Sequence, residues 1–578
     1  MSSLPSLPEP HPGLRAVVVV PARDEEARIE ACLHALAEQR RMKPGSYEAI
    51  VVLDGCGDGT AAMVRACASA RPGLAVHAIE LALPQGVGRA RRLGMDLACA
   101  RLLDVGRPGG LIASTDADSV VAVDWLACQL DLAGRGARAI GGHIELDLTE
   151  SLTLSSGALQ ERERRAGERM QALLAHEPRR AGVTSEHHQF SGASLALTAE
   201  TYRACGGLPV RAALEDEALE LELRALRIPI HRSRAVQVRT SARTDGRAPR
   251  GLARDLERSD WRTRRSYSAA EFPLERLLAA KRESIALVLP AREVAATIGP
   301  IAARAAALRE AGLLDEVLVV DAASGDGTAR VAEAGGVAVV QESELFSELG
   351  PARGKGDAMW RALGAIDSDI VAFVDTDTTQ FGEHFLTGLL GPLICEPALQ
   401  LVKGFFRRPF LADGALLAHG GGRVTELMAR PLLNLHIPEL AVFDQPLAGE
   451  MAGRRELLER IPFGAGYGVE IAMLIDAWRI VGLDGLGQVD LGVRQNRHQS
   501  LRDLSAMAYE VLLAASSRLL GPDFADAHGG ASLLLPPLDG DTHMESRRVT
   551  IEERPPLVEY RRGLLRDEQR ADPHLSLP

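Results

Sequence analysis

Short apolar runs recur along the chain, and two of them end in a pair of acidic residues. Residues 369–377 read Asp-Ile-Val-Ala-Phe-Val-Asp-Thr-Asp, and residues 111–118 read Leu-Ile-Ala-Ser-Thr-Asp-Ala-Asp. An unbroken apolar run of this length is typical of a parallel strand that is buried on both faces. We therefore expect each acidic pair at the carboxyl edge of a sheet, where ligands bind in open α/β folds.

Apolar runs alternate with segments that have helical periodicity. Residues 16–20 and 49–53 predict strands, and Ile29, Cys32, Leu33 and Leu36 between them predict one face of a helix. A Gly-rich turn at 55–59 precedes Thr60, which suits the start of the next helix. This alternation predicts a mostly parallel sheet with helices on both faces.

The same order of elements returns after Ser284. Residues 285–292, 317–321, 353–358 and 375–377 repeat the first strand and turn, the second strand, the Gly/basic loop and the acidic pair. A period of roughly 260 to 270 residues indicates a duplicated domain and not a solenoid. We predict a disordered tail (1–13), a first domain (14–245), a linker (246–283), a second domain (284–520) and a helical C-terminal extension with a tail (521–578).

Several stretches outside the repeat carry local expectations. Thr240 to Arg265 has little apolar periodicity and is interpreted as loop and linker, closed by a short helix near 272–281. A helix is expected after Arg502, and a strand-and-loop element over 544–560. The polar residues 561–578 are expected to be frayed.

Composition narrows the function classes. The net charge of −12 over 578 residues argues against a general nucleic-acid binder. Seven scattered cysteines without Cys-x-x-Cys spacing are typical of reduced thiols. Neither a signal peptide nor an apolar run long enough to span a membrane is recognisable, so we expect a cytoplasmic protein.

Two carboxylates at a strand end suit a hard divalent cation that also binds diphosphate oxygens. The ordered set of Pro-Ala turn, strand-end Asp, Gly-Asp-Gly-Thr, Gly/basic loop and Asp-x-Asp resembles the GT-A fold of nucleotide-sugar glycosyltransferases. The resemblance implies two tandem GT-A domains of Rossmann-like, mostly parallel α/β class. The alternative is a Rossmann-like sheet whose acids only cap helices and turns.

The first half is similar to the inverting family 2 glycosyltransferases. The resemblance implies that Asp216 is the base that takes the acceptor proton and that Asp118 binds the metal. Glu215 to Glu222 is alternatively a solvated acidic helix face, and His187 and His188 receive no role. The implied nucleotide-sugar residues are Pro21, Ala22, Glu25, Asp54, Arg89 (with Arg91) and Asp116.

The second half resembles the glucosyl-3-phosphoglycerate synthase family. The resemblance is carried by Gly-Gly-Gly-Arg-Val-Thr-Glu-Leu at 420–427 and Gly-Tyr-Gly-Val-Glu at 466–470. Glycines that lead into a helix, with an arginine and a threonine, suit an anion, although a tight turn is the alternative. The resemblance implies a catalytic Glu470; nucleotide-sugar binding by Pro290, Ala291, Glu293, Asp321, Lys355 and Asp375; acceptor binding by Gly422, Arg423 and Thr425; and Mg²⁺ or Mn²⁺ binding by Asp377 with His498 or Asn496.

Two departures from that family leave alternatives open. Val294 stands where the family has the glutamate that faces the uracil base of the nucleotide, and Glu293 could take that place only after a one-residue shift. Ala322, after Asp321, also replaces a small polar residue of the family. Asn496 stands at the position of the family's metal-binding histidine. Either Asn496 binds the metal, or His498 reaches it by a local shift, or His498 faces the acceptor.

These resemblances together imply a tandem glycosyltransferase. Its second half is expected to transfer glucose, with retention, from a nucleoside diphosphate (UDP-glucose first) to 3-phosphoglycerate, and its first half is expected to be an inverting transferase. The alternatives are an activity like that of mannosyl-3-phosphoglycerate synthase and a first half that is a non-catalytic binding or assembly module. The resemblance also implies a homodimer.

Overall fold

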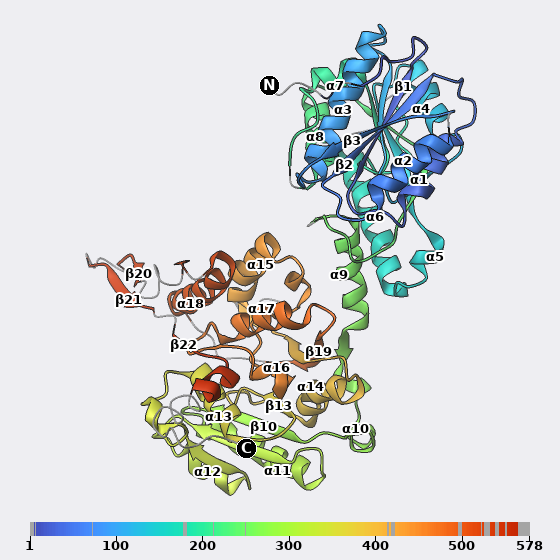
Figure 1. Ribbon diagram of the computed structural model, residues 1–578. Coiled ribbons are helices and arrows are strands. Elements are labelled where there is room, and N and C mark those ends of the chain that lie inside the picture. Colours follow the sequence, from blue (N-terminus) through green and yellow to red (C-terminus); the bar gives the residue numbers. More distant parts are fainter. Residues whose placement is uncertain are drawn as a thin grey trace, which may run out of the picture. The chain divides into compact units, whose positions relative to one another are not determined.

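The computed structural model divides into two compact units, Met1–Thr263 and Arg264–Pro578, which are described separately here (Figure 1). The described residues are 5, 7–71, 73–176, 182–211, 213–248, 250–412, 415–417, 422–494, 500–521, 523–524, 532–537, 543–549 and 552–563. Within these residues, no helix is both long enough and apolar enough to cross a membrane.

The first unit is built on an eight-stranded sheet of order β3-β2-β1-β4-β7-β6-β8-β5. Its first four strands are parallel, and β7 then runs antiparallel to both β4 and β6. The strands are β1 (Ala16–Ala22), β2 (Tyr47–Asp54), β3 (Ala75–Leu81), β4 (Leu111–Ser114), β5 (Ser119–Val121), β6 (Ala139–Leu146), β7 (Leu195–Thr198) and β8 (Ile230–Thr240).

Helices cover both faces of this sheet, as the alternation of elements predicts (Figure 1). In β1, Val18 and Val20 pack toward α1, α2 and α4, whereas Val17 and Val19 pack toward α3, α7 and α8. The helices are α1 (Ile29–Ala37), α2 (Thr60–Ala70), α3 (Val87–Asp104), α4 (Trp125–Gly134), α5 (Leu148–Ser151), α6 (Ser156–His176), α7 (Ala199–Ala204), α8 (Glu215–Ala225) and α9 (Leu252–Arg264).

The second unit repeats the architecture, with an eight-stranded sheet of order β12-β11-β10-β13-β17-β14-β19-β9. Again four parallel strands are followed by one antiparallel strand, β17, which lies between β13 and β14. The strands are β9 (Ser266–Ser268), β10 (Ile285–Ala291), β11 (Glu316–Asp321), β12 (Ala338–Gln341), β13 (Ile370–Phe373), β14 (Leu401–Arg407), β17 (Met451–Arg454) and β19 (Leu486–Val493). Two mostly parallel α/β sheets in tandem confirm the predicted fold class.

The remaining elements of the second unit are helices and short strands. The helices are α10 (Leu274–Ala280), α11 (Ala295–Glu310), α12 (Thr328–Ala334), α13 (Lys355–Ala365), α14 (Glu383–Cys395), α15 (Arg430–His436), α16 (Arg455–Leu458), α17 (Val469–Val481) and α18 (Leu501–Leu520), and η3 (Thr425–Ala429) is a π-helical turn. The short strands are β15 (Phe410–Ala412), β16 (Ala415–Leu417), β18 (Phe463–Gly464), β20 (Ser532–Leu535), β21 (Glu545–Arg548) and β22 (Glu553–Arg554).

Two local expectations are wrong. The stretch interpreted as loop between Thr240 and Arg265 contains helix α9, in which only Leu256, Asp260 and Trp261 are buried. Close ion pairs such as Arg254–Glu257 at 2.7 Å support a helix that has so narrow an apolar stripe. The predicted disordered tail is also partly ordered, because Arg101 donates a hydrogen bond to the carbonyl of Pro8 at 2.6 Å.

Other local expectations agree with the structure. The short helix near 272–281 is α10, the helix after Arg502 is α18, and 544–560 contains β21 and β22. Most of the predicted frayed stretch, 564–578, lies outside the described residues.

Candidate active sites

Three charged side chains meet at the carboxyl edge of the second sheet. Lys355 is the first residue of α13, Asp375 follows β13, and Glu470 lies in the first turn of α17. Lys355 Nζ lies 2.5 Å from Asp375 Oδ1 and 2.8 Å from Glu470 Oε1. Burial disfavours the charged forms, but the two carboxylates outweigh it at Lys355 and raise the pKa of that amine. The sequence predicts all three as site residues, and the structure brings them together although Asp375 and Glu470 lie 20 and 115 positions from Lys355 along the chain.

An arginine bridges the Asp-x-Asp pair of this unit. Arg494, just after β19 and 2% exposed, donates to Asp377 Oδ1 at 2.6 Å, lies 3.5 Å from Asp375 Oδ2 and pairs with the buried Glu450. Although burial of Asp375 favours its protonated form, Lys355 and Arg494 hold the pKa of this carboxyl well below its usual range. Asp375 is therefore a fixed anion and a weak base.

In the turn after β10, the position of Glu293 differs from the one that the predicted one-residue shift requires. Glu293 is exposed, has φ of +51°, and accepts a hydrogen bond from the backbone N–H of Gly325 at 2.8 Å. Val294 packs against the apolar core, so the one-residue shift that would let Glu293 take its place is absent. Asp321 is buried at the end of β11, and its Oδ1 lacks a hydrogen-bond partner within the described part of the chain. Pro290 and Ala291 end β10 beside it.

The predicted acceptor residues lie at the start of η3. Gly422 has φ of +75°, a conformation that favours glycine, and its carbonyl accepts from the N–H of Glu426 at 3.0 Å. Thr425 is buried, and Arg423 is partly buried beside it. The two glycines before Gly422 lie outside the described residues.

The first unit contains a cavity of about 1020 Å³ at the corresponding edge of its sheet. Its lining includes seven of the eight residues predicted for this site, namely Pro21, Ala22, Glu25, Asp54, Asp116, Asp118 and Asp216. Arg89 is the exception, because it is exposed and lies outside the lining, whereas Arg91 is buried in it.

Arginines also hold the acidic pair of this unit. Arg91 donates to Asp116 Oδ1 at 2.9 Å and to the buried Glu215 at 3.1 Å. Arg243 lies 2.9 Å from Asp118 Oδ2 and pairs with Glu25. Burial and the neighbouring charge of Asp116 raise the pKa of Asp118 to about 6. Because Glu215 is buried and paired, the start of α8 is not simply a solvated acidic face.

The predicted base of the first unit is held by backbone groups. Asp216 Oδ2 accepts from the N–H of Gly192 at 3.0 Å, and Oδ1 accepts from the N–H of Glu217 at 2.9 Å. Among the described residues, no lysine or arginine forms an ion pair with Asp216. Its carboxylate is therefore oriented in the cavity lining without being neutralised. Asp54 instead accepts from the N–H groups of Gln85 and Gly86, at 2.7 and 2.9 Å.

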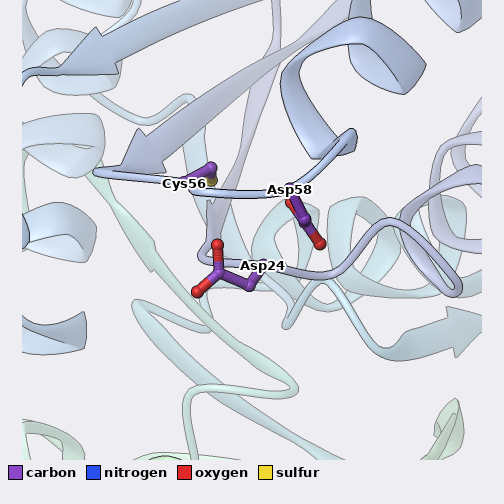
Figure 2. A group of neighbouring side chains, drawn as sticks. All are labelled: Asp24, Cys56 and Asp58. Carbon is purple, nitrogen blue, oxygen red and sulfur yellow. The ribbon is translucent and has the colours of Figure 1, made fainter.

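Asp24, Cys56 and Asp58 form a group that has the spacing of metal ligands (Figure 2). The contacts indicate a structural role: Asp24 accepts from the N–H of Gly57 at 2.6 Å, and Asp58 accepts from the N–H of Thr60 at 3.0 Å. The second unit repeats both bonds, from Gly325 to Glu293 at 2.8 Å and from Thr328 to Asp326 at 3.0 Å, without a cysteine. We therefore interpret this group as stabilising the turn after β1 through hydrogen bonds to the loop after β2.

Comparisons with known proteins identify related sequences. Residues 17–175 match the model "Glycosyl transferase family 2". Glucosyl-3-phosphoglycerate synthase of Mycolicibacterium smegmatis is 41% identical over 302 residues, which are 52% of this chain and 98% of that protein. The chain belongs to the glucosyl-3-phosphoglycerate synthase family. The Petrotoga mobilis member of that family is 37% identical, over 49% of this chain and 90% of its own. The chain is accordingly a homologue of hexosyltransferases.

Solved structures of similar proteins are also known. Mannosyl-3-phosphoglycerate synthase from Rubrobacter xylanophilus is 43% identical, over 52% of this chain and 99% of its own, with a TM-score of 0.47. Glucosyl-3-phosphoglycerate synthase from Mycobacterium tuberculosis, in complex with Mn²⁺, UDP and glucosyl-3-phosphoglycerate, is 40% identical. The match covers 50% of this chain and 96% of that chain, with a TM-score of 0.44. Another structure of the latter protein holds Mg²⁺ and UDP.

The residues of this chain fit a divalent cation. The side chain of Asp377 is 64% exposed at the sheet edge, so its oxygens are accessible to Mg²⁺ or Mn²⁺. In the first unit, burial and then the charge of Asp116 raise the pKa of Asp118, and a bound cation would favour its charged form. Asn496 and His498 lie outside the described residues, so both remain predicted ligands.

Three residues at these sites are not foreseen from the sequence, namely Arg494, Glu450 and Lys403. Arg494 and Glu450 contact each other across 44 positions of the chain. Lys403, on β14, is 1% exposed and donates to the carbonyl of Ala448 at 2.8 Å. Burial lowers the pKa of Lys403 to about 8. A lysine in an apolar strand pattern was the available signal, because a lysine is almost never fully buried without a partner.

Proposed function

We propose that the second unit transfers glucose, with retention, from UDP-glucose to 3-phosphoglycerate. The observation that carries this proposal is the group of Lys355, Asp375 and Glu470 at the sheet edge, next to the open carboxylate of Asp377. The lengths of the alignments support the assignment to this unit. Matches of 302 and 318 residues are longer than the unit Met1–Thr263 and therefore extend into the second.

The residues of the second unit stabilise the charge on the leaving diphosphate and orient the hexose. A bound Mg²⁺ or Mn²⁺ would neutralise the charge that develops on the leaving diphosphate. Lys355 adds a fixed positive charge to the same side of the site, and Glu470 orients the hydroxyls of the hexose. Both acids at Lys355 are engaged in ion pairs, so neither suits the removal of the acceptor proton. That proton passes to an oxygen of the departing phosphate, which lies on the same face as the attack and so accounts for retention.

The acceptor is held by Gly422, Arg423 and Thr425. A guanidinium, a hydroxyl and a backbone turn that permits close approach suit the phosphate or the carboxylate of 3-phosphoglycerate. The positive φ of Gly422 supports this role, because any larger residue would strain the turn.

The first unit, in this proposal, is a second and inverting sugar transferase. Asp216 accepts the acceptor's proton as the hydroxyl attacks the anomeric carbon from the face opposite the diphosphate. Its unpaired carboxylate in the cavity lining supports this role over that of a binding or assembly module.

One experiment tests the proposed reaction of the second unit in the full chain. The chain is incubated with 3-phosphoglycerate and UDP-glucose, GDP-glucose or GDP-mannose, with Mg²⁺ or with EDTA, and the product linkage is read by NMR. The expected product is α-linked glucosyl-3-phosphoglycerate, formed only with metal. Preferential transfer of mannose would replace the proposal with the mannosyl alternative, and a β-linked product would contradict retention.

A further inference from the structure

Helix α6 forms one wall of the cavity in the first unit. It has 21 residues, of which Ala158 alone is buried, so packing against the core does not explain its composition. One face of the helix lines the cavity with Ala158, Arg162, Arg165, Ala166, Arg169, Ala172, Leu173 and His176.

Two of these arginines form no ion pair with a described residue. Arg165 pairs with Glu161 at 2.6 Å, but no carboxylate of a described residue lies within ion-pair distance of Arg162 or Arg169. Arg162 donates to the carbonyl of Ile144 at 3.3 Å, which places it beside β6. His188 lies in the same lining. Burial, followed by the charges of Arg169 and Arg162, lowers the pKa of His188 to about 4.

Several acids of the cavity form ion pairs with arginines that lie outside α6. Glu25 and Asp118 are paired with Arg243, and Asp116 and Glu215 are paired with Arg91. Glu220 pairs with Arg232 at 2.7 Å. Arg162 and Arg169 on the α6 wall therefore carry positive charge that forms no ion pair with the described acids of the lining, although Asp216 and Glu217 line the same cavity. Positive charge on a cavity wall attracts an anion.

The position of α6 in the fold indicates which ligand this is. In the first unit, α5 and α6 form the insertion between β6 and β7; in the second, the corresponding insertion between β14 and β17 contains Gly422, Arg423 and Thr425. Because the two sheets have the same strand order, the two insertions stand at the same place beside their acidic pairs. The insertion assigned to acceptor binding in one unit has arginines in the other.

We propose that the α6 face, with Arg162, Arg169 and His188, binds an anionic acceptor, namely a glycoside that carries a carboxylate or a phosphate. This inference rests on the proposed function of the first unit. The acceptor's hydroxyl oxygen forms a bond to the anomeric carbon of the donor sugar, its proton moves to Asp216, and the bond from that carbon to the diphosphate oxygen breaks. The product of the second unit belongs to this acceptor class, so the two reactions can follow one another.

The test uses the full chain with Asp377→Ala and Arg423→Gln, so that binding of metal and of acceptor at the second site is weakened. Binding is measured by calorimetry with UDP and Mn²⁺ present, for the phosphorylated glucosyl glycerate, for the same glycoside without its phosphate, and for an uncharged glucosylglycerol. The variants are Arg169→Gln, which removes an exposed charge from the wall, and Arg162→Gln. Arg164→Gln is the matched control, because Arg164 lies on α6 but pairs with Glu161 and lies outside the cavity lining.

We expect at least one anionic glycoside to bind about tenfold or more tightly than the uncharged one, and Arg169→Gln to abolish most of that preference. Arg164→Gln should leave it unchanged. The phosphorylated and dephosphorylated arms distinguish recognition of a phosphate from that of a carboxylate. Equal or stronger binding of the uncharged glycoside, no binding of either anion, or an unaltered Arg169→Gln chain would overturn the inference. Separately, failure of this chain to transfer sugar from UDP-glucose, GDP-glucose or GDP-mannose to any of these glycosides would remove the proposed function of the first unit itself.

Discussion

Gly449 is the position at which a single methyl group tests the second site most simply. A Cβ built on Gly449 lies 2.5 Å from both Asp375 Oδ1 and Lys355 Nζ and 2.6 Å from Asp375 Oδ2. Ordinary contacts of this kind begin at 3.4 Å, so Gly449→Ala requires these groups to move by about 0.9 Å. Asp375 cannot retreat easily, because Lys355 and Arg494 both hold it.

A displacement of about 1 Å in a catalytic constellation costs about 100-fold in rate, or about 2.7 kcal/mol of transition-state stabilisation. We therefore expect Gly449→Ala to lower kcat/KM for glucosyl transfer to 3-phosphoglycerate by about that factor. Gly563→Ala is the control, because the space around Gly563 is open within 4 Å. Thermal unfolding of both variants shows whether the fold is intact. A Gly449→Ala chain that keeps full kcat/KM would refute the placement of this ion pair on the reaction path.

Three further predictions concern other parts of the chain. Asp216→Asn should abolish sugar transfer by the first unit and leave that of the second intact, as product analysis of the same preparation would show. Arg554→Met removes two bonds to the buried Asp357, two residues from Lys355, and should lower the free energy of unfolding by about 3 kcal/mol in a denaturant titration, whereas Arg561→Met at an exposed pair should have little effect. Burial lowers the pKa of His187 from 6.5 to about 3, so the unfolded chain binds this proton at a higher pH than the folded chain does. The free energy of unfolding should therefore decline by about 1.4 kcal/mol per pH unit as the pH falls from 6.5 toward 3. Urea titrations at several pH values measure this decline, and His187→Gln should flatten it.

Much of the fold follows from local patterns in the sequence. The apolar runs before Asp116 and Asp375 predict buried parallel strands, and the order in which these runs recur predicts the duplication. Helix α9 is not predicted because only two of its buried residues, Leu256 and Trp261, are apolar, and ion pairs between its side chains supply further stabilisation.

The candidate sites were less accessible from the sequence, because their charge balance depends on long-range contacts. Arg494 meets residues 117 and 119 positions away, and Arg243 meets Glu25 across 218. Glu293 illustrates the same limit: its identity suggested a replacement for the missing glutamate, but its backbone position gives it the bracing role of Asp24. Nothing local to the sequence distinguishes these two possibilities.

The central claim is that the acidic pair after β13 supports sugar transfer to phosphoglycerate. It is tested most directly by measuring, with Mg²⁺ present, the formation of glucosyl-3-phosphoglycerate by the full chain and by its Asp377→Ala and Asp118→Ala variants. Loss of this product in Asp377→Ala, with full retention in Asp118→Ala, is the predicted result. Undiminished product formation by Asp377→Ala would contradict the account.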